Sequence, residues 1–133
     1  MLASYLPPLI GYFSYLASGV ALLIVFAMLY IKITPYDELT LIREGNVAAS
    51  LSLGGALMGF SFALASSAWH LNQLEFFLLW GALAGLVQIV VYAFLVKCIK
   101  GMPSAIIENN VAVGLLVGSI SLAVGVINAG CLS

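Results

Sequence analysis

VAASLSLGGALMGFSFALASSA, residues 47–68, decides the fold of this chain, because a run of this length has no charged side chain. As an α-helix, roughly 20 apolar residues span the hydrocarbon core of a bilayer, which is about 30 Å thick. Three further uncharged runs have a similar length, at about 9–31, 76–96 and 111–132. The sequence therefore predicts an all-α integral membrane protein with four transmembrane helices.

The composition also favours a membrane protein over a soluble one. Of the 133 residues, 64% are apolar and 7% are charged, whereas soluble domains average roughly 45–50% and about 25%. A transmembrane β-barrel is excluded, because its strands alternate apolar and polar residues and these runs do not. The formal net charge is −1, and no basic cluster points to nucleic acid or anionic lipid. The partner expected from composition is membrane lipid.

The basic residues predict an orientation in the membrane. Lys32 and Arg43 lie between the first and second runs, and Lys97 and Lys100 lie between the third and fourth. Short loops that carry positive charge stay in the cytoplasm. Both termini are therefore expected on the periplasmic or outer side.

The chain matches itself when it is shifted by 64 residues. LIREGNVAA at 41–49 falls on AIIENNVAV at 105–113, so that Glu44 meets Glu108 and Asn46 meets Asn110. Each half holds two of the predicted spans, so both halves enter the membrane from the same side. The match predicts two tandem helical hairpins in parallel orientation, residues 1–68 and 69–133, forming one transmembrane domain. The alternative is chance similarity between two stretches of common hydropathy.

Three polar residues are candidates for an ion or ligand pathway. Glu44 and Glu108 would lie at equivalent depths near the cytoplasmic boundary, where paired carboxylates can concentrate a cation. Alternatively, each is a solvated residue or the partner of a nearby basic side chain. Gln88 lies near the middle of the third run, where an amide must face protein or water. It serves either helix packing or the lining of a pore.

The entrance to the second span has further readable signals. Thr34 is suited to cap a helix that begins at Pro35, and Gly45 permits a bend into the bilayer. Asn46 and Asn110 are expected to hydrogen-bond between helices, which contributes about 0.6 kcal/mol per contact in a membrane protein. The alternative role for these two amides is to bind a substrate.

Small residues form ridges on three of the four runs. The pairs are spaced as small-xxx-small motifs, which let helices approach closely: Gly55 and Gly59, Gly81 and Gly85, Gly114 and Gly118. A single four-helix chain uses only some of its faces internally. We therefore predict that the chain forms a homo-oligomer.

Catalytic and metal-binding patterns are not visible in the sequence. We find no nucleophile with a plausible base, no paired catalytic acids, no phosphate loop and no nucleotide fingerprint. One histidine, His70, and two separated cysteines, Cys98 and Cys131, do not make a metal site. We predict that the protein is not an enzyme and uses no cofactor or metal.

The stretch ITPYDELTLIREGNVAASLSLGGALMGFSFALASS, residues 33–67, resembles a bacterial inner-membrane family, domain of unknown function 350, the YjfL-type or UPF0719 proteins. The resemblance covers essentially the whole chain and is most specific at 34–59. It implies a multi-pass protein of the bacterial inner (plasma) membrane, and it brings no established activity or catalytic residues.

Two functional hypotheses follow. The first is a self-associating envelope component that acts through assembly or contacts with an envelope protein partner. The second is an oligomeric channel or carrier for a cation or small amine that uses Glu44 and Glu108.

Overall fold

The computed structural model describes residues 2–70 and 73–132 and is entirely helical over its regular elements. The helices are α1 (Leu2–Ile33), α2 (Glu38–Arg43), α3 (Val47–His70), α4 (Leu74–Cys98), α5 (Met102–Ile107) and α6 (Val111–Cys131). The four long helices are long and apolar enough to cross a membrane, which confirms the predicted all-α class with four candidate spans. Residues 1 and 133, at the ends of the predicted repeat units, and 71–72, in the predicted outer connection, lie outside the described residues.

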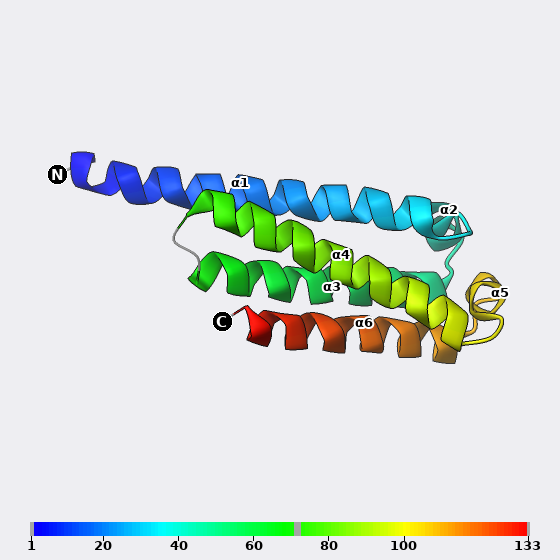
Figure 1. Ribbon diagram of the computed structural model, residues 1–133. Coiled ribbons are helices and arrows are strands. Elements are labelled where there is room, and N and C mark those ends of the chain that lie inside the picture. Colours follow the sequence, from blue (N-terminus) through cyan, green and yellow to red (C-terminus); the bar gives the residue numbers. More distant parts are fainter. Residues whose placement is uncertain (1, 71–72, 133) are drawn as a thin grey trace.

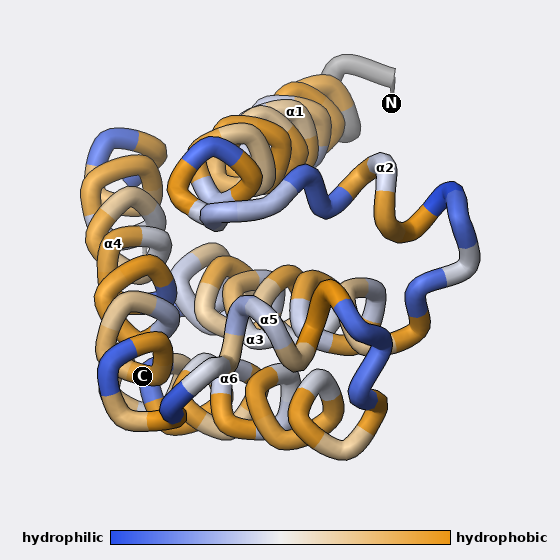
Figure 2. The backbone as a smooth tube through the Cα atoms, turned by 90° about the vertical axis from the view of Figure 1, so that its right-hand side faces the viewer, coloured by the Kyte–Doolittle hydropathy of each residue, from blue (hydrophilic) through white to orange (hydrophobic). Residues whose placement is uncertain are grey.

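The four long helices lie side by side in an elongated bundle (Figure 1). The short helices α2 and α5 lie at one end, and the N-terminal end of α1 and the C-terminal end of α6 lie at the other. The first turns of α1 project beyond the other helices. Seen from the α2 and α5 end, α1, α3 and α6 form a stack with α4 beside it (Figure 2).

The entrance to α3 differs in one respect from the sequence-based expectation. Thr34 does not cap a second helix, because its hydroxyl donates to the carbonyl oxygen of Ile31 at 2.8 Å and so ends α1. A residue before proline avoids the helical conformation, which stops α1 ahead of Pro35. Asp37 is the cap instead, since its carboxylate accepts from the backbone N–H of Thr40. The predicted bend at Gly45 is present, with φ of +87°.

The two short helices begin 64 residues apart, at Glu38 and Met102, and so do the long helices that follow them, α3 and α6. Gly45 and Asn109, again 64 residues apart, both have positive φ. The backbone hydrogen bonds also correspond, because Asn46 donates to the carbonyl of Leu41 at 2.9 Å and Asn110 donates to that of Ala105 at 2.8 Å. This is the spacing at which the two halves of the sequence match.

The closest packing in the bundle is between α3 and α6, which run in the same direction. A Cβ atom placed on Gly55 would overlap the backbone of Gly118, and one placed on Gly125 would overlap the backbone of Gly59. Because the backbone of one helix contacts the backbone of the other at these glycines, the two helix axes lie close together. Small residues permit such close packing in membranes. In an apolar 18-residue stretch of each span, the buried share is 56% for α3 and 11% for α1.

Candidate functional site

Two adjacent carboxylates at the start of α2 have opposite environments. The Asp37 side chain is exposed and accepts a hydrogen bond from the Thr40 hydroxyl at 2.7 Å. These bonds to Thr40 lower the pKa of Asp37. Glu38, the next residue, is 0% exposed. One residue of a helix turns the side chain by about 100°, which takes Glu38 from water into the protein.

The carboxyl group of Glu38 is unpaired in its buried position. Neither of its oxygens has a hydrogen-bond partner among the described residues. An ionised carboxylate without a partner is very costly in such a place. Burial raises the pKa of Glu38 to about 8. The nearby Tyr36 hydroxyl lowers this pKa in part, although it forms no hydrogen bond of ordinary geometry with the carboxyl.

Three buried tyrosines lie within electrostatic range of this carboxyl, and we call them the tyrosine cluster: Tyr30 of α1, Tyr36 of the link to α2, and Tyr92 of α4. The rings of Tyr30 and Tyr92 lie 5.0 Å apart, and the Tyr92 hydroxyl donates to the Tyr36 hydroxyl at 3.4 Å. The Tyr30 hydroxyl lies 3.4 Å from that of Ser52 in α3. Glu38 is close enough to interact electrostatically with all three tyrosines.

This arrangement is suited to hold a proton. No part of Glu38 is accessible even to a water molecule, so a proton is the ligand that its carboxyl can take without rearrangement. Burial also raises the pKa of Tyr36, which keeps that hydroxyl neutral. The site therefore combines a weak buried acid with uncharged hydroxyl groups.

The three pathway residues predicted from sequence do not come together in one chain. Glu44 and Glu108 are exposed and form the C-caps of α2 and α5. Gln88 is 1% exposed, and its side-chain amide donates to the carbonyl oxygen of Ser121 in α6 at 3.2 Å. Gln88 lies ten residues before the end of α4 at Cys98, about 15 Å along the helix. The glutamates are thus at the surface, and Gln88 is inside the bundle.

The two asparagines predicted to bond between helices have different partners. Asn46 is buried and donates to the carbonyl oxygens of Ile106 at 2.8 Å and Ile107 at 3.2 Å, both in α5. Asn110 is exposed and accepts from the backbone N–H of Val113 in its own helix. The link from the second half back to α3 comes instead from Asn109, which accepts from the backbone N–H of Ala48 at 3.1 Å.

All six predicted ridge glycines contact other helices of the same chain. Gly55, Gly59, Gly114 and Gly118 lie between α3 and α6, while Gly81 contacts Leu22 and Leu64 and Gly85 contacts Phe26 and Phe60. These ridges are therefore occupied within one chain. Their number alone no longer argues for association between copies.

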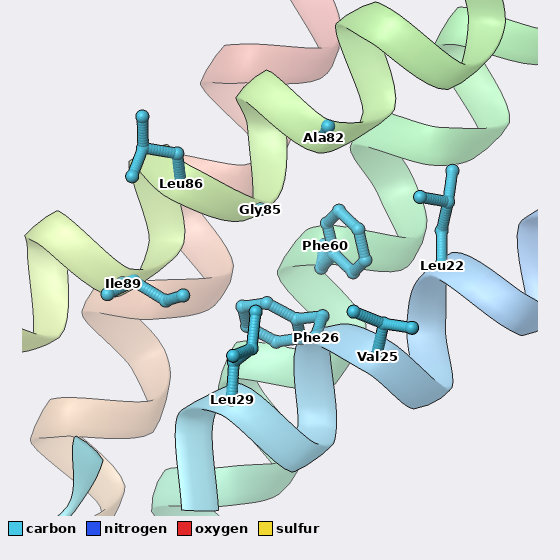
Figure 3. Close-up of a pocket in the computed structure, with 9 residues that line it drawn as sticks. All are labelled: Leu22, Val25, Phe26, Leu29, Phe60, Ala82, Gly85, Leu86 and Ile89. Atoms are coloured by element: carbon cyan, nitrogen blue, oxygen red, sulfur yellow. The ribbon is translucent and has the colours of Figure 1, made fainter. Parts of the chain in front are cut away.

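An apolar pocket of about 220 Å³ lies between α1, α3 and α4 (Figure 3). Its walls carry no polar side chain: Leu22, Val25, Phe26, Leu29, Phe60, Ala82, Gly85, Leu86 and Ile89. The rings of Phe26 and Phe60 meet inside it, with centroids 4.5 Å apart. Such a lining suits an acyl chain and offers no group for catalysis.

Sequence reasoning missed Glu38 and the tyrosine cluster. Asp37 and Glu38 both suit the positive end of a helix dipole, so the sequence alone gives them one role. A usable signal was present in Tyr30 and Tyr92, which place hydroxyl groups inside two apolar spans.

Comparison with known proteins gives a consistent result. A family model described as Domain of Unknown Function (DUF350) matches residues 2–132. The UPF0719 inner membrane protein YjfL of Escherichia coli (strain K12) is 35% identical over 128 residues, 96% of this chain and 97% of that protein. The protein of that name from Escherichia coli O157:H7 matches to the same extent. No solved structure matches the chain. With its four apolar helices, the chain belongs to the DUF350 family as a multi-pass inner membrane protein.

Proposed function

We propose that the protein self-associates in the inner membrane and acts through assembly and contacts with envelope proteins, without catalysis. The observation that carries this proposal is an open groove of about 200 Å³ along α3 and α6. Its lining is Ser50, Leu51, Gly54, Gly55, Met58, Leu115, Gly118, Ser119 and Leu122. None of these residues belongs to α1 or α4, so neither helix covers the groove.

The groove has the properties of a helix-docking surface in a membrane. A Cβ atom placed on Gly54 would meet nothing within 4 Å, so another backbone can approach there. The Ser50 hydroxyl donates to the carbonyl oxygen of Val47 at 2.7 Å and does not need water. Helices associate in lipid through such close van der Waals packing.

The occupant that we propose is a second copy of the chain. On another side of the α3 and α6 pair, α4 approaches closely, because a Cβ atom on Gly59 would lie 2.6 Å from the side-chain nitrogen of Gln88. If residues 1–68 and 69–133 are two parallel hairpins, α3 and α6 are equivalent helices. The side of the α3 and α6 pair that α4 covers then has a counterpart on the opposite side of the pair, where a further helix can pack. The equal 64-residue spacing of α2 with α5 and of α3 with α6 supports this repeat.

Cysteine crosslinking in native membranes tests the proposal. Ser119→Cys is placed in a chain that lacks Cys98 and Cys131, with Val90→Cys as control on the exposed face of α4. Copies related by a twofold axis present the same patch to each other, so Ser119→Cys should yield dimers and Val90→Cys should not. Monomers alone from Ser119→Cys, with no other protein attached, would contradict the proposal.

A second candidate function is a channel or carrier for a cation or small amine. It is supported by Glu44 and Glu108, two exposed carboxylates that cap α2 and α5 at one end of the bundle (Figure 1). Because Gln88 is buried against α6 and the two glutamates are exposed, we place the pathway of this second candidate between copies of the chain.

Flux measurements in liposomes test the second candidate. Glu44→Gln combined with Glu108→Gln should change cation selectivity, since it removes the charges that attract cations. Glu75→Gln, in the first turn of α4, is the control at the opposite end of the bundle. An absence of flux for the unmodified protein under varied voltage, pH and ion composition would eliminate this function.

A further inference from the structure

We infer that Glu38 is a proton-binding site and that its protonated side chain holds α2 against the bundle. This site is separate from the groove on α3 and α6, and it does not depend on self-association. The ligand class is the proton itself, taken up from the α2 side of the membrane.

The construction of α2 makes its position depend on Glu38. The helix has only six residues, and Glu38 is its one buried residue. Pro35 precedes it, and Gly45 follows with positive φ. Leu41 and Ile42 of α2 are partly buried against the core, but Glu38 is the one α2 side chain that is fully buried, so its protonation state bears directly on the position of this short helix.

The ionisable groups near Glu38 are tyrosines. The ionisable side chains that interact with it are the three members of the tyrosine cluster, from α1, the link and α4. Helix α3, which packs against α2, carries no ionisable side chain before His70 at its far end. No basic group acts on Glu38 among the described residues. The charge of an ionised Glu38 would therefore remain uncompensated.

Ionisation of Glu38 is not compatible with its buried position. A carboxylic acid that loses its proton here becomes a carboxylate with no hydrogen-bond partner among the described residues and no exposure to solvent. Such a group moves to solvent or takes its proton back. Since burial raises the pKa of Glu38 to about 8, the carboxyl group gains and loses its proton near neutral pH. Release of α2 then accompanies release of the proton.

Infrared difference titration of the full chain in lipid nanodiscs tests proton binding. The carbonyl band of a protonated carboxylic acid should persist well above the ordinary glutamate pKa of 4.5 and disappear with a midpoint near 8. It should be absent in Glu38→Gln and retained in Glu44→Gln, a matched change at an exposed position of the same segment. A wild-type chain without this band, or a band that survives in Glu38→Gln, overturns the inference.

A second variant guards against misfolding of Glu38→Gln. Glu38→Met introduces the residue found 64 positions later, Met102, which is fully buried at the start of α5. It should fold and also lack the late-titrating band. Retention of the band in folded Glu38→Met would again overturn the assignment.

Spin labelling tests the coupling to α2. A label on Leu39→Cys, exposed on α2, is compared with one on Ile107→Cys, exposed on α5, in a chain without native cysteines. Mobility at position 39 should rise over the pH interval in which the band is lost, and Glu38→Met should abolish the rise. Unchanged mobility at position 39, or an equal rise in Glu38→Met, refutes the holding role.

Discussion

Glu38 and Asp37 show how much one step of a helix changes the chemistry of a carboxylate. Hydrogen bonds from Thr40 lower the pKa of Asp37, and burial raises that of Glu38. The first group favours the start of α2 in its charged form, while the second favours the position of α2 in its neutral form. The start of α2 thus places a carboxylate whose ionised form is favoured beside one whose neutral form is favoured.

The stability of the folded chain should consequently depend on pH through Glu38. The unfolded chain loses this proton near pH 4.5 and the folded chain near pH 8, so between these values the unfolded state binds fewer protons. Stability should therefore fall as pH rises across this window, by at most about 1.4 kcal/mol per pH unit. Denaturant unfolding in detergent, followed by circular dichroism, should show the slope in wild type and Glu44→Gln and its loss in Glu38→Gln. Equal slopes in all three proteins would contradict this expectation.

Asn46 and Asn110 offer a second comparison between single residues. Both cap a long helix, but only Asn46 also bonds to the carbonyls of α5. Removal of a cap costs about 1 kcal/mol, and each interhelical polar contact adds about 0.6 kcal/mol. In the same unfolding measurement, Asn46→Ala should therefore be the more destabilised by about 1 kcal/mol. Equal losses would show that the bonds to α5 contribute nothing.

At the scale of the helix, α3 and α6 depend on backbone contact along their shared face. Gly55 and Gly54 are neighbours with opposite surroundings, since a Cβ atom would overlap Gly118 from the first and meet open space from the second. Gly55→Ala should destabilise the chain by about 1–3 kcal/mol through overpacking. In a detergent that keeps the chain monomeric, Gly54→Ala should be neutral or stabilising by up to about 1 kcal/mol, as alanine favours helix. Thermal unfolding in detergent distinguishes these outcomes, and similar losses for both variants would rule out the close α3–α6 contact.

The sequence predicted the four spans because their length and apolar character do not depend on which neighbours they have. Pairing of the helices was harder to predict, since in lipid the outer face of a helix is as apolar as its inner face. The six ridge glycines show the limit, because their spacing indicated close packing without naming α3, α4 and α6 as partners within one chain. The capping signal placed the start of the next helix at Pro35, whereas α2 begins at Glu38 after its cap Asp37, so the sequence did not indicate that Glu38 is the first residue of a helix and buried.

For the whole molecule, labelling of the two native cysteines tests the orientation that the basic residues predict. Cys98 ends α4 next to α5, whereas Cys131 ends α6 at the opposite end of the bundle, and both are exposed (Figure 1). With both termini outside, a membrane-impermeant maleimide should label Cys131 in spheroplasts and Cys98 only after permeabilisation. Cys98→Ser and Cys131→Ser identify each signal. The reverse pattern would show that the protein is inserted the other way round.

Because α1 is long, its tilt should depend on the thickness of the membrane. Its apolar span, Leu6–Ile33, has 28 residues and is about 42 Å long when straight, against about 30 Å of hydrocarbon. A helix with such an excess leans over or thickens the surrounding lipid, and α1 is the span with the least protein around it. A thinner bilayer should tilt α1 further. Because Tyr36 and Asp37 connect α1 to α2, we expect this tilt to change the position of Glu38.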